Sequence, residues 1–81
     1  MVDMKLDYSY LLDCINSYYE GNTIEQKIVR FCKDIKIKVY RFKRIIENKP
    51  KCYFMSDEII RIIKKLNIQE NKIAECFFKE V

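Results

Sequence analysis

Apolar residues recur every three or four positions along most of the chain, which is the spacing of an amphipathic helix. The pattern predicts five short helices, over roughly 8–19, 24–35, 38–47, 56–66 and 69–79. One run, 35–39, alternates as a strand would, but it interrupts helical spacing and is interpreted as a turn between two helices. The expected fold class is therefore all-α, a compact bundle of about five short helices. We expect one domain over 1–81, with 1–6 as a flexible tail.

Helix-capping residues support these boundaries. Asp7 is placed to cap the first helix, and Gly21 to end it in a left-handed conformation. Thr23 followed by Gln26 is typical of a capping box at the start of the second helix. Ser56 is expected to cap the fourth.

Positive charge is concentrated in the middle of the chain. The net charge is +4, yet residues 27–51 hold ten basic side chains against Asp34 and Glu47, so the rest of the chain is net negative. Such an asymmetry attracts a polyanion to one face of a protein. A solvated helix face in a lysine-rich protein would give the same charge. Only the motif that carries the charge can distinguish such a face from a polyanion-binding one.

The residues that usually bind metals or act in catalysis favour neither a metal site nor an enzyme. There is no histidine, and no two cysteines form a CxxC pair, so we expect neither a zinc site nor another cofactor. No nucleophile has an evident catalytic base, and we expect no enzymatic activity and no small-molecule substrate. No apolar run is long enough to span a membrane, and we expect a cytoplasmic, nucleoid-associated protein of a bacterial host cell with reduced thiols. The four cysteines are Cys14, Cys32, Cys52 and Cys76.

Residues 28–47 match the pattern of a helix-turn-helix. This motif needs a small residue where its helices cross, apolar residues that lock both helices to the core, and a tight turn between them. Counting from Ile28, the fifth position is the small residue Cys32. The other positions that must be apolar are Phe31, Ile35, Ile37, Phe42 and Ile45. The sequence thus predicts a DNA-binding motif whose second helix is basic on its outer face.

With this motif in place, the chain resembles the Cro/CI-type helix-turn-helix regulators of phages and mobile elements, in particular small Cro-like phage proteins of about this length. Further segments are similar to that family at the start of the first helix (7–9), after the third (47–49), at the fourth (54–60) and at the end (68–81). The resemblance implies a lambda-repressor-like DNA-binding domain. It also implies a transcriptional repressor that binds double-stranded DNA.

The resemblance also implies which side chains meet DNA. The positions that face base edges fall on Lys38, Val39, Tyr40 and Arg44. Arg41 and Lys43 would lie nearer the DNA backbone. The other expected phosphate contacts are Lys27, Arg30, Lys36, Lys49 and Lys51.

The chain departs from the family pattern at three places. Ile28 stands where the family usually has a glutamine that contacts phosphate, and Lys36 stands at the turn glycine. A left-handed backbone at Lys36 would cost about 1 kcal/mol. The loop around 50–53 is about two residues longer than usual.

Two questions about partners stay open at this level. Phe77, Phe78 and the broad apolar arc of the fourth helix fit either an ordinary core or a homodimer interface. The basic helix also fits a protein-interaction module of the same fold, such as an antirepressor or an anti-CRISPR-like inhibitor of host nucleic-acid machinery that binds a host protein. Membrane-surface binding is less favoured, because the apolar face of 38–46 is expected to serve the core.

Overall fold

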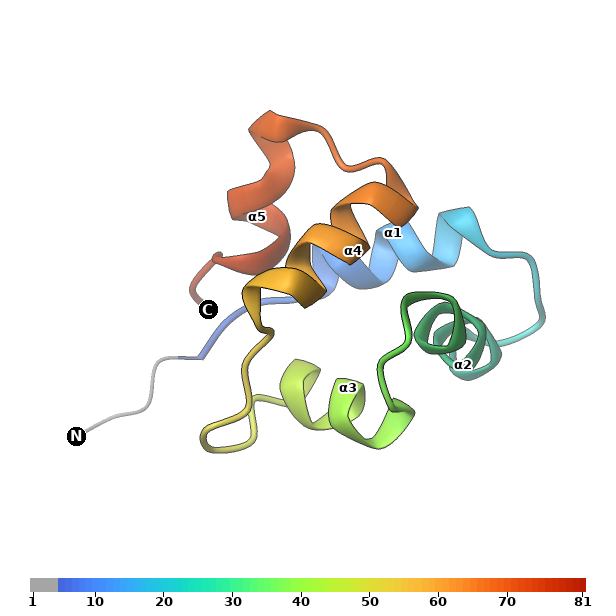
Figure 1. The fold of residues 1–81 in the computed structure, drawn as a ribbon, viewed down its shortest axis with the longest axis horizontal. Helices are drawn as coiled ribbons and strands as arrows, with labels where there is room; N and C mark the ends of the chain where they lie inside the picture. Colours follow the sequence, from blue (N-terminus) through green and yellow to red (C-terminus); the bar gives the residue numbers. More distant parts are fainter. Residues whose placement is uncertain (1–4) are drawn as a thin grey trace.

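A computed structural model describes residues 5–81 and shows an all-α bundle, as the helical spacing predicts (Figure 1). No strand occurs among these residues, although Leu6 and Glu80 form one isolated antiparallel bridge. The helices are α1 (Ser9–Tyr18), α2 (Ile24–Ile35), α3 (Val39–Ile46), α4 (Ser56–Leu66), the 3-10 turn η1 (Glu70–Lys72) and α5 (Ile73–Phe77). The fifth helix, predicted over 69–79, is thus a 3-10 turn followed by a short α-helix.

The helices pack around α1 and α2. α1 contacts α2, α4 and α5, while α2 also contacts α3 and α4. Figure 1 shows α3 at the edge of the bundle, beside α2 and on the opposite side of the molecule from α5. One flank of α3 is therefore free of other helices.

One continuous core joins these elements. Aromatic rings run through it in edge-to-face or tilted contact, with centroid distances of 5.7 Å for Phe31 and Phe42, and 5.9 Å for both Phe42 with Phe54 and Phe54 with Phe77. Such pairs add about 0.5–1.5 kcal/mol each beyond their buried area. The series fixes α2, α3, the loop after α3 and α5 relative to one another.

The helix ends follow the sequence in part. The Thr23 hydroxyl accepts a hydrogen bond from the Gln26 amide (3.2 Å), as capping predicts. Asp7 accepts one from the Ser9 amide (2.9 Å), but Tyr8 rather than Asp7 is the N-cap residue of α1. Gly21 has no positive φ, because α1 ends earlier with an extended Tyr19. Ser56 is the first residue of α4 rather than its cap.

The expected tail at 1–6 is wrong for its last two residues, and residues 1–4 lie outside the described part. The Leu6 amide donates to Asn48 Oδ1 (2.8 Å), and Asn48 Nδ2 donates back to the Leu6 carbonyl (2.9 Å). The Lys5 carbonyl accepts from the Val81 amide (3.1 Å). Residues 5 and 6 are therefore held to the bundle through their backbone groups, and the hydrophobic pattern of the sequence does not show such contacts.

Candidate nucleic-acid interface

The segment from α2 to α3 buries each apolar position of the predicted motif. Ile28, Phe31, Cys32 and Ile35 of α2 are buried, as are Ile37 in the turn and Phe42 and Ile45 of α3. Burial raises the pKa of the Cys32 thiol to about 11, so this small residue remains a neutral packing group. The side chains at the motif positions thus hold α2 and α3 against one core.

The turn between α2 and α3 is left-handed at Lys36, with φ 60° and ψ 43°. The Lys36 amide donates to the Lys33 carbonyl (3.4 Å) and the Ile37 amide to the Cys32 carbonyl (3.0 Å). This pair of hydrogen bonds is a Schellman motif, in which the left-handed position usually carries glycine. The turn after α2 therefore has a left-handed residue that is a lysine, where glycine would be unstrained.

The outer face of α3 carries Tyr40 and Arg44, one turn apart. Tyr40 is 73% exposed, and the Arg44 guanidinium lies 5.6 Å from the centre of its ring. The pKa of Arg44 is raised because the Cys52 thiol and the Tyr40 hydroxyl accept its hydrogen bonds. Lys38 is exposed at the N-cap of α3, while Val39 is half-buried against the core. Of the four expected base-reading residues, Tyr40 and Arg44 lie together, Lys38 is exposed at the start of the helix, and Val39 is partly used by the core.

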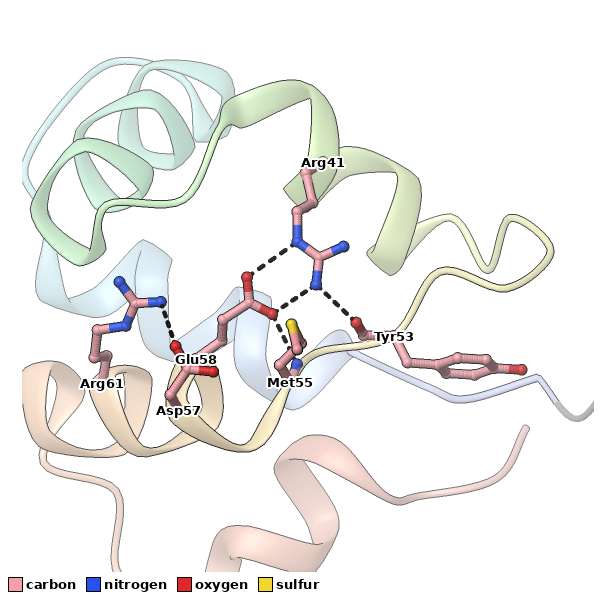
Figure 2. Close-up of polar contacts among 6 residues, drawn as sticks. All are labelled: Arg41, Tyr53, Met55, Asp57, Glu58 and Arg61. Carbon is pink, nitrogen blue, oxygen red and sulfur yellow. Dashed lines mark hydrogen bonds and ion pairs between the residues drawn. The ribbon is translucent and has the colours of Figure 1, made fainter.

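Arg41, an expected phosphate contact, has a structural partner within the protein (Figure 2). Its guanidinium donates to both carboxylate oxygens of Glu58, at 3.0 and 2.7 Å, and to the Tyr53 carbonyl at 3.0 Å. Glu58 is only 6% exposed and also accepts from the Met55 amide (2.7 Å), so it caps α4. The arginine's hydrogen bonds lower the pKa of Glu58, which stays ionised. Arg41 therefore ties α3 to α4.

Three further basic residues of the expected phosphate set are also engaged within the protein. Lys43 Nζ lies 2.5 Å from Glu25, which raises the pKa of this lysine. Lys27 donates to the carbonyl and side chain of Asn16 (3.0 and 2.7 Å), and Arg30 to the Glu20 carbonyl (3.0 Å). These contacts hold α2 to α3 and to the end of α1.

The remaining expected phosphate contacts are exposed. Lys49 lies 3.9 Å from Glu47, a distance at which the ion pair is weak in water. Among residues 5–81, no side-chain hydrogen bond or ion pair engages Lys36 or Lys51. The free positive charge near α3 thus lies at its two ends.

The two phenylalanines expected at a dimer interface have different surroundings. Phe77 is 2% exposed and packs on Phe54 in the core, so it cannot offer its ring to a second subunit. Phe78 is 58% exposed, and Tyr53 and Met55 are exposed as well. The interface prediction is therefore wrong for Phe77, and Phe78 alone of the pair is accessible.

The sequence interpretation missed Glu58 and the cations of α4. Glu58 caps α4 from its third position, but Met55 is not a residue type that usually marks a capping box, so the sequence gives no clear signal of this role. Arg61, Lys64 and Lys65 lie outside the basic 27–51 segment and were assigned to no site, although α4 brings them close to the end of α2.

Comparisons with family models, with curated proteins and with solved structures found no match for this chain. Within the described residues 5–81, no helix is long and apolar enough to cross a membrane. The same residues contain no group of three or more histidine, cysteine or acidic side chains that could hold a metal ion. The interpretation of the α2–α3 segment accordingly depends on its own residues and geometry.

Proposed function

We propose that the protein is a sequence-specific double-stranded DNA-binding regulator, a Cro-like repressor of a phage or mobile element, with α3 in the major groove. The observation that carries this proposal is the α2–α3 segment. Its apolar motif positions are buried, its turn is left-handed at the ninth position, and the outer face of α3 is basic and aromatic. Those are the features by which a helix-turn-helix holds its second helix ready for a groove.

The side chains on α3 suit base recognition. Arg44 and Lys38 can donate to the O6 and N7 atoms of guanine, and Val39 can contact a thymine methyl group. Tyr40 packs against Arg44 and so limits the conformations of that long side chain. An arginine held in this way loses less conformational entropy on binding.

The backbone contacts would come from the ends of α3. Lys36 precedes the helix, and Lys49 and Lys51 follow it, so positive charge lies on both sides of the exposed face. Phosphate contacts at such positions fix the register of a recognition helix without reading sequence.

Selection from a random duplex pool, followed by measurement of the salt dependence of the winning duplex, tests the proposal. We expect one enriched sequence whose affinity falls with salt at a log–log slope near −0.9 for each phosphate neutralised. A near-palindromic winner would indicate a homodimer with recognition helices about one DNA turn apart. Undetectable or salt-independent duplex binding would overturn the proposal.

A protein-interaction module of the same fold is the second candidate, and one observation favours it. Glu25 lies in the first turn of α2, where a helix-turn-helix usually contacts phosphate, and its carboxylate pairs with Lys43. The pair neutralises Lys43, so α3 offers less positive charge to a DNA strand. Stoichiometric binding of a purified host protein, together with no retardation of random or promoter duplexes, would favour this candidate over the first.

A further inference from the structure

A second basic region lies where the end of α2 faces α4. A hollow of about 370 Å³ opens there, and none of its lining residues belongs to α3. Its lining residues are Asp34, Ile35, Lys36, Arg61, Lys64 and Lys65. Four cations therefore surround one carboxylate.

The carboxylate in the hollow is already neutralised. Asp34 accepts a hydrogen bond from the Tyr19 hydroxyl (2.6 Å), and Lys65 Nζ lies 3.5 Å from the same oxygen. The Tyr19 hydroxyl, and then Lys65, lower the pKa of Asp34, so this pairing holds at neutral pH. Lys36 and Lys64 remain unpaired, and Arg61 shares its charge with Asp57.

Arg61 has a donor without a partner. One terminal nitrogen lies 3.1 Å from Asp57, but the buried Nε–H has no hydrogen-bond acceptor among residues 5–81. Figure 2 shows this guanidinium extending from α4 towards the connection between α2 and α3. Buried donors are usually paired with a protein group or an ordered water, so an unpaired one calls for an explanation.

Lys36 and Lys64 add unpaired charge beside it. Both are exposed, and neither takes part in a side-chain hydrogen bond or ion pair within the described part of the chain. Lys36 is fixed in place by the left-handed turn, and Lys64 by the last turn of α4. Two point charges thus flank the planar fork of an arginine.

We infer that this hollow is an anion site that takes a phosphate group, with Arg61 as its fork and Lys36 and Lys64 as its flanking charges. Arginine matches the spacing of phosphate oxygens, and lysine adds charge without strict geometry. The hollow is larger than one phosphate, so the group can belong to a bigger molecule. That molecule is either a DNA strand, which contributes a backbone phosphate, or a free phosphorylated compound.

Nitrogen-15 NMR with pyrophosphate as the probe tests the site directly. We expect saturable shifts of the Arg61 Nε–H signal and of the Lys36 and Lys64 amides. Arg61→Gln should abolish them, and Lys64→Gln should weaken binding about tenfold. Lys72→Gln is the matched control, since Lys72 pairs with Glu75 outside the hollow. Because Lys64 is exposed, its variant tests the site even if Arg61→Gln unfolds.

Shifts that do not saturate, or that are equal at Lys72, would overturn the inference. So would pyrophosphate binding by Lys64→Gln as tight as that of the unmodified protein.

A parallel titration with the selected duplex identifies the source of the phosphate. If Lys64→Gln weakens duplex binding and lowers its salt slope by about one phosphate, the DNA backbone supplies the group, and the site is supported. If duplex affinity is unchanged while pyrophosphate binding is weakened, a free phosphorylated compound is the ligand, and the site is again supported. The pyrophosphate result stands even if no duplex binds, so failure of the proposed function is distinguishable from failure of this site.

Discussion

Lys36 is the residue at which the local backbone and the local sequence conflict most clearly. Its φ of 60° places a β-carbon in the left-handed region, where glycine carries no steric penalty. The turn is nevertheless formed, because buried Ile37 and Cys32 on either side of it pack in the core. Tertiary packing thus outweighs a residue that disfavours the conformation.

Replacing Lys36 by glycine should therefore stabilise the fold. We expect Lys36→Gly to be about 1 kcal/mol more stable than Lys36→Ala in urea unfolding, since both remove the charge and only alanine keeps the strained β-carbon. If the backbone at this position were ordinary, the order would reverse, because glycine would then lose more entropy on folding.

The four cysteines differ in their surroundings, although the sequence shows only their spacing. All four are free, and burial raises the pKa of Cys32 to about 11 and that of Cys76 to about 12. Cys14 and Cys52 are half-buried.

Alkylation of the folded protein near neutral pH should distinguish these two pairs. We expect iodoacetamide to modify Cys14 and Cys52 first, and Cys32 and Cys76 only at the rate of unfolding, because the thiolate is the nucleophile. Peptide mass spectrometry over time measures this. Early labelling of Cys32 would contradict the burial of this α2 residue in the core.

At the scale of elements, the Arg41–Glu58 ion pair positions α3. It joins the first turn of α3 to the first turn of α4 and to the loop between them. Since Arg41 comes from the helix that carries Tyr40 and Arg44, the pair also sets how that helix faces solvent. A change at Glu58 should therefore affect both stability and binding.

Glu58→Gln is expected to cost about 2 kcal/mol at neutral pH, because a carboxylate with charged and capping hydrogen bonds becomes a neutral amide. The pKa of Glu58 is lowered in the folded state, so its contribution is present above the unfolded pKa of about 4.3 and disappears as the pH falls through the folded value. Urea unfolding at a series of pH values from 7 downwards checks this, and the difference between the two proteins should shrink as the pH falls through the folded pKa of Glu58.

Asp57→Asn is the matched control for that substitution. Asp57 is the neighbouring carboxylate, and its pair with Arg61 is exposed, so we expect a change below about 0.5 kcal/mol. Equal losses for the two variants would show that the buried pair has no special role.

The helices were predictable from sequence because their apolar spacing is regular, and the start of α2 and the end of α2 near Ile35 agree with the structure. The ends of α1 and α4 were less predictable. Gly21 and Ser56 are good capping residues, but capping depends on where the packed helix stops. Contacts between distant segments, such as the Leu6 amide with the Asn48 side chain, involve backbone groups that leave no pattern in the sequence.

The candidate site was predictable in outline for the same reason. Burial of the motif positions follows from their spacing, whereas the partners of Arg41 and Lys43 depend on side chains 17 and 18 residues away in sequence. Counting charge along the chain could not separate the neutralised cations from the free ones. The count also missed the basic hollow, because Lys36 and Arg61 lie in different halves of the sequence.

At the scale of the whole molecule, the bundle leaves one flank of α3 free (Figure 1). Exposed lysines lie at both ends of this helix. The internal ion pairs reduce the charge that the 27–51 segment can offer a ligand. Binding to duplex DNA is therefore expected to depend on a few residues at α3 rather than on net charge.

The most direct test of this account compares two variants on the selected duplex and on a scrambled one. Removing Lys38, Tyr40 and Arg44 together should lower the ratio of specific to non-specific affinity by at least about tenfold, since each good base contact contributes roughly 1–3 kcal/mol of discrimination. Lys33→Ala, which removes an exposed charge from α2, should leave the ratio unchanged. A ratio that stays constant in the triple variant, or falls equally in Lys33→Ala, would contradict the claim that α3 reads DNA.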